Sequence, residues 1–341
     1  MMLKLAFAGF GVVGRGLAEL LHAKSKLLAS RYGLECSVVA VSDKLKGAVM
    51  DPSGLDLGKL IKAGEKGKLE ELKAPKKGFD VLQMIQEAGA DALVEVTYTD
   101  IKTGEPATTH IRKALELGMH VVTTNKGPVA LYYRELAELA KKKGVKFLFE
   151  GTVMSGTPVL NLLRENLAGC EITEMRGILN GTTNYILTKM EEGLPYADAL
   201  KSAQALGYAE AIPDADVLGW DALAKVTILA NVVLGARLKP FDCPCEGITK
   251  IKPEDVKAAR AEGKRYKLIG RVWMEGNAVR ASVGPQRVEL THPLAGVGGA
   301  TNALTITTDA LGEVTIIGPG AGKRETGYSL LNDLLHIGGR L

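Results

Sequence analysis

Short apolar runs alternate with amphipathic stretches along the first 150 residues of the chain. The apolar runs predict strands at residues 3–8, 36–42, 91–96, 120–124 and 146–149, and the stretches between them predict helices at 16–31, 108–117 and 131–143. Strands that are apolar without alternation are buried on both faces of a sheet. The pattern therefore predicts an α/β domain over residues 1–150, a doubly wound parallel sheet of the Rossmann type.

The pattern changes after residue 150. Helices are predicted at residues 157–166, 196–206 and 219–234, followed by strands near 269–274 and 279–283 in which apolar and polar positions alternate. This order predicts a second domain of the α+β class over residues 151–310. A strand at 314–317, a glycine-rich loop at 318–322 and a helix at 325–335 close the chain. We expect this last segment, residues 311–341, to return to the first domain.

Composition narrows the class of protein. The chain is 46% hydrophobic and 24% charged, with a net charge of +4 and no basic block, and its lysine-rich stretches at 59–77 and 141–146 are interpreted as solvated surface. A nucleic acid is therefore not an expected partner. No run approaches the roughly 20 apolar residues of a membrane span, and the N-terminus lacks the apolar core of a signal peptide. We therefore expect a cytoplasmic protein. Its four cysteines lack zinc-site spacing, and in that reducing compartment we expect them to be free thiols.

A glycine-rich turn links the first strand to the first helix, and it consists of Gly9, Phe10, Gly11, Val12, Val13 and Gly14. In this pattern the first glycine permits a tight turn, the second lets the backbone approach a pyrophosphate, and the third lets helix and strand pack closely. The helix N-terminus adds N–H groups and a positive dipole for phosphate. This context predicts a dinucleotide-binding site.

The end of the second strand bears on cofactor preference. Asp43 is placed to accept hydrogen bonds from the ribose hydroxyls of NAD, whereas Lys44 and Lys46 are placed to pair with the 2′-phosphate of NADP. The sequence leaves both cofactors open, and the two lysines lead us to expect that NADP binds at least as well as NAD.

Further polar residues lie where strands end or helices begin. Asn125 and Lys126 follow the strand at 120–124, at the sheet edge where ligands bind, although a single lysine there is as often a surface residue. The polar turns at 150–158 and 180–185 could face a ligand, but as isolated motifs both are more often plain turns than ligand sites.

The stretch from residue 207 to 225 holds four carboxylates and Lys225, and Lys225 is followed by an almost wholly apolar helix. Asp221 and Lys225 are i,i+4 neighbours, so one interpretation is a helix ion pair worth a few tenths of a kcal/mol. In the other, the apolar helix buries Lys225, and the loss of solvation makes the lysine a usable proton donor or acceptor. The residues alone leave both interpretations open.

Taken in order, seven segments of the chain resemble homoserine dehydrogenase, namely residues 9–14, 123–128, 150–158, 177–186, 207–225, 292–295 and 318–322. The resemblance implies a nucleotide-binding domain followed by a catalytic and dimerisation domain, a homodimer, and the reversible conversion of L-aspartate 4-semialdehyde to L-homoserine with NAD(P)H in threonine and methionine biosynthesis. The length implies the short form of the family, without a regulatory module.

The resemblance also implies roles for single residues. Lys225 matches the proton-transferring lysine with Asp221 beside it, and Lys126 matches a lysine near both cofactor and substrate. The implied substrate-binding carboxylates are Glu210 and Asp216. The implied cofactor contacts, besides the glycine-rich turn, Asp43, Lys44 and Lys126, are Thr97 and Gly322. The residues that match a sodium-binding turn are Glu150, Val153, Ser155 and Thr157.

One position departs from the family, and two rival functions stay open. Ile212 stands where the family usually has an acidic residue before the proline, which leaves the geometry of that loop open. A dehydrogenase of a related amino-acid carbonyl is a rival within the same class. A non-catalytic dinucleotide sensor is a rival of another class, against which Lys225 and Lys126 argue.

Overall fold

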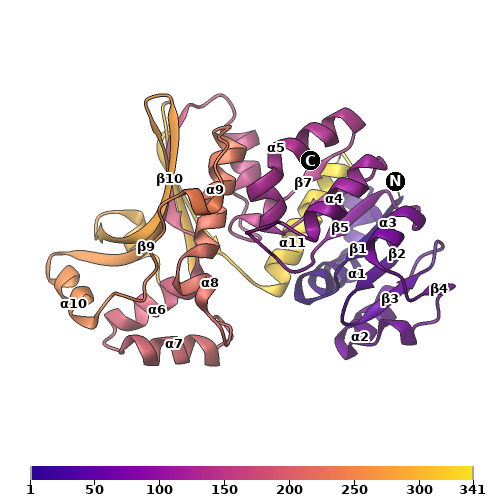
Figure 1. The fold of residues 1–341 in the computed structure, drawn as a ribbon, viewed down its shortest axis with the longest axis horizontal. Helices are drawn as coiled ribbons and strands as arrows, with labels where there is room; N and C mark the ends of the chain where they lie inside the picture. Colours follow the sequence, from indigo (N-terminus) through magenta and orange to yellow (C-terminus); the bar gives the residue numbers. More distant parts are fainter. Residues whose placement is uncertain (1, 340–341) are drawn as a thin grey trace. The chain divides into compact units, whose positions relative to one another are not determined.

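The computed structural model describes residues 2–339, which divide into two compact units. The first unit contains the chain up to Gly156 and again from Gly322 onward, and the second contains Thr157–Ala321 (Figure 1). The chain thus crosses between the units twice, and its last helix belongs with the first residues.

The first unit is built on a seven-stranded sheet with the strand order β4-β3-β2-β1-β5-β6-β7. The strands are β1 (Met2–Ala8), β2 (Glu35–Asp43), β3 (Gly47–Met50), β4 (Lys76–Lys77), β5 (Ala92–Glu95), β6 (His120–Thr123) and β7 (Phe147–Leu148). Five of them are parallel, as predicted, whereas β3 and β4 add an antiparallel edge beside β2 that the sequence did not predict. The strand order reverses between β1 and β5, and this switch point is where open α/β sheets bind ligands.

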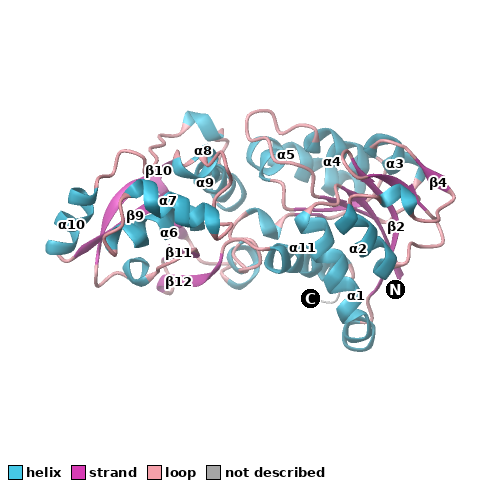
Figure 2. Cartoon of the chain, turned by 90° about the horizontal axis from the view of Figure 1, so that it is seen from below, coloured by secondary structure: helices cyan, strands magenta, loops and turns pink. Residues whose placement is uncertain are grey.

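Helices cover both faces of this sheet (Figure 2). On one side lie α1 (Val12–Tyr32), α2 (Leu57–Lys66) and α11 (Lys323–Ile337), and on the other lie α3 (Val81–Glu87), α4 (Ala107–Glu116) and α5 (Lys126–Lys143). Helix α5 begins five residues earlier than predicted because the Asn125 side chain accepts a hydrogen bond from the Gly127 N–H at 3.2 Å and so caps the helix.

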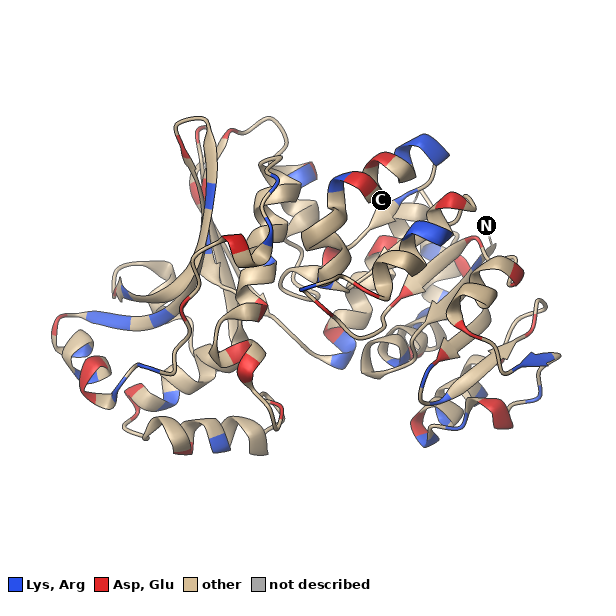
Figure 3. Cartoon of the chain, viewed as in Figure 1, with Lys and Arg blue, Asp and Glu red and all other residues tan. Residues whose placement is uncertain are grey.

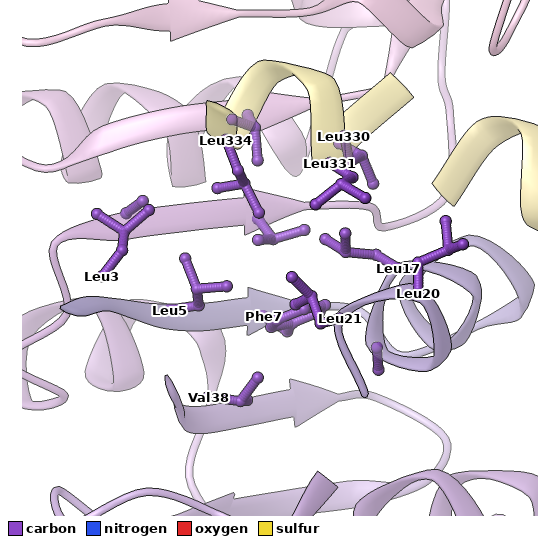
Figure 4. Close-up of a cluster of buried hydrophobic side chains, with 14 of the residues drawn as sticks. Leu3, Leu5, Phe7, Leu17, Leu20, Leu21, Val38, Leu330, Leu331 and Leu334 are labelled. Atoms are coloured by element: carbon purple, nitrogen blue, oxygen red, sulfur yellow. The ribbon is translucent and has the colours of Figure 1, made fainter. Parts of the chain in front are cut away.

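The core of the first unit explains why α11 returns to it. Buried leucines of α11 pack against those of α1 and against the apolar residues of β1 (Figure 4). The residues in contact include Leu5, Leu17, Leu330, Leu331 and Leu334. The returning segment begins at Gly322 rather than at residue 311, because β12 (Gly312–Pro319) pairs with β11 (Thr301–Thr308) in the second unit.

The lysine-rich stretch at residues 59–77 presents most of its lysines to solvent, as interpreted, but it also contains a helix, α2, that the sequence did not predict. The Asp56 carboxylate caps the helix by accepting from the Lys59 N–H at 2.8 Å, and Leu60 on its inner face is completely buried. The lysines occupy the outer face of α2, and because they dominate the sequence of this stretch, its apolar inner face was not recognised from the sequence.

The second unit is built on a five-stranded antiparallel sheet with the order β10-β9-β8-β11-β12. The remaining strands are β8 (Ile172–Ile178), β9 (Lys264–Glu275) and β10 (Ala278–Glu289), and the helices are α6 (Gly181–Glu191), α7 (Tyr196–Ala205), α8 (Asp214–Val217), α9 (Trp220–Val233) and α10 (Pro253–Ala261). Helix α9 packs so closely on one sheet face that a Cβ atom at Gly270 would lie 2.6 Å from Val226. The helix predicted at 157–166 begins only at residue 160 and continues as a π-helical turn, Leu162–Asn166.

Charge is distributed evenly over both units. Lysine and arginine are interspersed with aspartate and glutamate along the described chain (Figure 3). Among residues 2–339, no helix combines the length and apolar character that crossing a lipid bilayer requires.

Candidate active site

The glycine-rich turn lies at the carboxyl end of β1, as the sequence predicts. Gly9 has φ +90°, and a Cβ atom there would lie 2.7 Å from the Val96 carbonyl oxygen, so the turn and the neighbouring strand both require glycine. A Cβ at Gly11, by contrast, would meet no atom within 4 Å. This open space lies at the N-terminus of α1, where no side chain makes a capping hydrogen bond in the described chain. The uncapped N–H groups fit a pyrophosphate, so the turn fits a dinucleotide.

The turn after β2 holds the glycine-rich turn through the backbone N–H and C=O groups of one residue, Phe10. The Phe10 N–H donates to one carboxylate oxygen of Asp43 at 2.7 Å, and the Lys46 ammonium donates to the Phe10 carbonyl, also at 2.7 Å. The other Asp43 oxygen accepts from the Leu45 and Lys46 N–H groups. Burial and the nearby Arg15 charge lower the pKa of Lys46, and Asp43 opposes this shift. Lys44 is exposed.

Thr97 lies on the loop after β5, and Lys126 begins α5 directly after the loop that follows β6, so both lie on the other side of the switch point from Asp43. Asn125 joins these loops, since its amide donates to the Tyr98 carbonyl at 2.9 Å. Lys126 is half-buried in the first turn of α5. The fold therefore places the expected cofactor contacts of the first unit along the carboxyl edge of one sheet.

The second unit brings a lysine and two carboxylates together around Asn180. The Lys225 ammonium donates to the Leu179 carbonyl at 2.6 Å and to the Asp221 carboxylate at 2.7 Å, and only 7% of Lys225 is exposed. Asn180 caps α6 and donates its amide N–H groups to Asp216 at 2.6 Å and to Asp221 at 3.0 Å. The predicted i,i+4 ion pair therefore exists, and Lys225 is buried, while its role in proton transfer stays a prediction.

The electrostatics of this cluster centre on Asp216. Its pKa is raised by burial and by the neighbouring Asp221 charge, while the Asn180 hydrogen bond and Lys225 oppose the shift. Two carboxylates held this close favour a cation between them, and a substrate ammonium has the required charge.

Glu210 is not brought into the cluster. It is exposed, and its backbone carbonyl accepts a hydrogen bond from the Gln204 side chain at 3.1 Å. Ile212 in the same loop is 77% exposed. The loop is tied back at Tyr208, whose carbonyl accepts from the Thr182 hydroxyl at 2.6 Å. The role of Glu210 stays a prediction.

The turn expected to hold sodium has an unusual backbone. Met154 and Ser155 have φ +57° and +54°, a left-handed conformation that non-glycine residues seldom adopt, and Glu150 is 3% exposed. The Glu150 N–H donates to the buried Asp333 of α11 at 3.1 Å, and the Ser155 hydroxyl bonds Thr326 at 2.7 Å. Thr157 belongs to the second unit, where its hydroxyl donates to the Pro319 carbonyl.

Three further residues build the sites although the sequence analysis gave them no role: Asn180, Asn184 and Glu95. The motif at 180–185 contains Asn180 and Asn184, but the sequence does not reveal their partners. Asn180 donates to the carboxylates, whereas Asn184 donates to the carbonyls of Val297, Gly299 and Thr301. Glu95 is a charged residue at the end of an apolar strand, a position that usually faces solvent, yet it is completely buried.

A dinucleotide turn at the switch point of one unit and a buried lysine–carboxylate cluster in the other define, as a class, a nicotinamide-dependent dehydrogenase. A family model described as the NAD-binding domain of homoserine dehydrogenase matches residues 9–150, and one described as homoserine dehydrogenase matches residues 158–335.

Relatives agree with these matches over the whole length of the chain. The chain is 46% identical to the NAD(+)-dependent homoserine dehydrogenase of Pseudomonas canavaninivorans, covering 98% of this chain and 96% of that one. It is 44% identical to a homoserine dehydrogenase of Methanocaldococcus jannaschii, with 98% of both chains covered. A hyperthermophilic archaeal homoserine dehydrogenase in complex with NADPH superimposes with a TM-score of 0.85 at 32% identity, covering 100% of this chain and 99% of that one.

The chain belongs to the homoserine dehydrogenase family. It is an NAD(P)-dependent oxidoreductase that interconverts L-homoserine and L-aspartate 4-semialdehyde, a step of threonine and methionine biosynthesis.

Proposed function

We propose that Lys225 moves the proton between enzyme and substrate oxygen in this reaction and that Asp221 orients it. One observation carries the proposal: the Lys225 ammonium is buried and fixed by the Leu179 carbonyl and the Asp221 carboxylate. An ammonium has three N–H groups, and these two bonds leave the third for a substrate oxygen.

The proton moves in step with the change at the substrate carbon. The bound dinucleotide supplies or accepts the hydride. During reduction Lys225 donates its proton to the aldehyde oxygen as negative charge develops there, and during oxidation it accepts the hydroxyl proton of homoserine. Asp221 keeps the ammonium in one position, so the proton is delivered from a fixed direction.

Carboxylates beside Lys225 are proposed to bind the amino-acid end of the substrate. Asp216 is held by Asn180 next to Asp221, and burial and the Asp221 charge raise its pKa, so a substrate ammonium beside the two carboxylates would stabilise their charged forms. Glu210 is proposed as a further contact on the grounds of the family resemblance. Lys126, in the first turn of α5, is proposed to contact cofactor and substrate.

The mechanism is tested by replacing Lys225 with methionine, which keeps the aliphatic bulk and removes the charge. The turnover number of Lys225→Met should fall roughly 10²–10⁴-fold, the range for a positioned acid or base. The dissociation constant of the reduced cofactor, measured by its fluorescence, should hardly change because Lys225 lies in the second unit.

The matched control is Lys250→Met, which removes an exposed i,i+4 lysine paired with Glu246 at 3.4 Å. This variant should keep full turnover. A folded Lys225→Met enzyme that turns over within about threefold of the parent would lie outside the expected range and would remove Lys225 from the mechanism.

The cofactor contacts are proposed to be the glycine-rich turn, Asp43, Thr97, Lys126 and Gly322, and NAD is proposed to serve at least as well as NADP. Both carboxylate oxygens of Asp43 accept from backbone N–H groups, one from the glycine-rich turn and the other from the turn after β2. A 2′-phosphate beside Asp43 would therefore meet a fixed negative charge. Lys46 is already bonded to the Phe10 carbonyl, and Lys44 is exposed. These contacts reverse the expectation drawn from the two lysines alone. A kcat/KM that favours NADP and loses that preference in Lys46→Ala would overturn this proposal.

A monovalent cation, sodium, is proposed to bind the turn that contains Glu150, Val153, Ser155 and Thr157. The support is a buried carboxylate next to a strained backbone whose carbonyl oxygens are suitable ligands for a hard cation. No cluster of three or more acidic, histidine or cysteine side chains able to hold a metal occurs within residues 2–339, so backbone oxygens would complete the site. The test is the ²³Na resonance of sodium ions in the presence of the protein. If the protein does not broaden this resonance, and Glu150→Gln does not alter it, the site is excluded.

The enzyme is proposed to act as a homodimer in the cytoplasm. The apolar face of the second unit's sheet is covered by α9, but the opposite face presents Arg271, Trp273 and Ile317, with Ile317 53% exposed.

The four cysteines are all free thiols, as in a reducing compartment. Recovery of the native enzyme from a periplasmic or secreted fraction would contradict the cytoplasmic assignment.

A further inference from the structure

A carboxylate that the proposed mechanism does not use is completely buried at the carboxyl end of β5. Glu95 is 0% exposed, and β5 lies between β1 and β6, beside the switch point of the sheet. Its side chain accepts hydrogen bonds from the hydroxyl and, at 3.3 Å, from the N–H of Thr97. Burial of a carboxylate is costly unless hydrogen bonds compensate, so these donors hold both Glu95 and the Thr97 loop in place.

The second loop at this edge is bonded to the same residue. Thr123, at the end of β6, donates to the Glu95 carbonyl at 2.8 Å and lies 3.4 Å from the carboxylate. The Thr123 hydroxyl also accepts from the Asn125 N–H at 3.0 Å, and Asn125 caps α5 directly before Lys126. Continuous hydrogen bonds therefore link the loop after β5 to the loop after β6 through Glu95.

A residue of the helix layer covers the carboxylate as well. His110 of α4 is 7% exposed, and its Nδ1 atom lies 3.5 Å from a Glu95 carboxylate oxygen without forming a hydrogen bond. The hydrogen bonds of Thr97 and Thr123 therefore hold this carboxylate in position.

The direction of the dinucleotide identifies what these loops meet. The pyrophosphate binds at the glycine-rich turn after β1, and Asp43 after β2 marks the adenosine side. The nicotinamide half must therefore extend toward the ends of β5 and β6. We propose that Glu95 is a positioning residue for the nicotinamide half of the cofactor, acting through Thr97 and Thr123. The proposal rests on the cofactor contacts proposed above for Thr97 and Lys126.

The test separates the two halves of the cofactor by calorimetric titration with NAD and with ADP-ribose, which lacks the nicotinamide. Glu95→Leu should raise the dissociation constant of NAD on the order of tenfold, as for the loss of about one good hydrogen bond. ADP-ribose should bind as it does to the parent enzyme. Glu95→Gln should recover part of the loss, because its amide oxygen still accepts from Thr97.

Two comparisons show whether the effect is local. Asp43→Ala, at the adenosine side, should weaken NAD and ADP-ribose alike. Glu135→Gln removes an exposed carboxylate of α5 that pairs with Arg112 and should change neither affinity. If Glu95→Leu does not fold, Thr123→Val serves instead, since Thr123 is completely buried and acts on a ligand only through its neighbours.

The outcome decides the proposal in either direction. A selective loss of NAD affinity in a variant that melts like the parent supports it. An equal loss of both ligands, or no loss of either, overturns it. The role of Lys225 would be unaffected, because that role is tested by turnover with cofactor binding intact.

Discussion

The side chains of the lysine–carboxylate cluster are each fixed in position by hydrogen bonds to neighbouring residues. Lys225 has a defined direction because Leu179 and Asp221 fix its ammonium, and Asn180 in turn fixes Asp221 and Asp216. Asn180 does so from the N-cap of α6, where its side-chain oxygen accepts from the Thr183 N–H at 2.9 Å. One amide group thus joins the stability of a helix to the geometry of the lysine–carboxylate cluster, which is proposed to be catalytic.

Two substitutions of Asn180 should separate these functions. Asn180→Asp keeps the capping oxygen but puts a third carboxylate where an N–H donor met Asp216 and Asp221, so turnover should fall at least tenfold, and any loss of stability comes from repulsion among the carboxylates rather than from the cap. Asn180→Ala should lower both, with a loss of about 1 kcal/mol for the missing cap. Kinetics and thermal melting measure the two effects. An Asn180→Asp enzyme with parental turnover would show that Asn180 is a cap and nothing more.

At the scale of elements, α11 shows how a distant segment completes a core. Its leucines are buried against α1 and β1, more than 300 residues away in the chain (Figure 4). Helical periodicity predicted the helix, but the face it covers depends on the partner surface. The same is true of α2, where lysines outside concealed the buried Leu60.

The contribution of α11 can be measured by Leu334→Ala. Leu334 is completely buried, with 0% of its surface exposed. Its truncation to alanine should therefore leave a cavity and lower the free energy of unfolding by about 2–5 kcal/mol. Denaturant unfolding of the first unit gives the value. Leu27→Ala on α1, where Leu27 is 43% exposed, is the control and should cost much less. Equal losses for both variants would mean that α11 is not part of this core.

At the scale of the whole molecule, the open face of the second sheet is what the single chain leaves uncovered. Arg271 stacks on Trp273 at 4.6 Å and bonds both carboxylate oxygens of Glu174, so the face is ordered and half-buried before any partner arrives. Aromatic and arginine side chains are enriched in protein interfaces, which fits the proposed homodimer.

Ile317→Glu tests the dimer with little risk to the fold, because the side chain is 53% exposed on β12. A charge brought into an apolar contact should shift the enzyme toward monomer, and light scattering at micromolar concentration reads this directly. Leu27→Glu, on α1 of the first unit, should leave the mass unchanged. A parent enzyme that is already monomeric under these conditions would exclude the dimer.

The sequence by itself determined the features that local chemistry specifies. The glycine-rich turn was predictable because only glycine has the backbone freedom and lack of a side chain that the Gly9 position needs. The strands of the parallel sheet were predictable because burial on both faces demands continuous apolar runs. Lys225 and Asp221 were found together because four residues is one turn of helix.

Tertiary structure alone decided what depends on contacts between distant segments. Nothing near Asp43 in the chain reveals that both of its oxygens accept from N–H groups of two turns, the observation on which the proposed cofactor preference rests. Nothing near residue 311 reveals that β12 pairs with β11 before the chain returns. Glu95 and Asn180 likewise received their partners from other elements, because a polar side chain becomes a positioning residue only when the fold buries it beside specific donors.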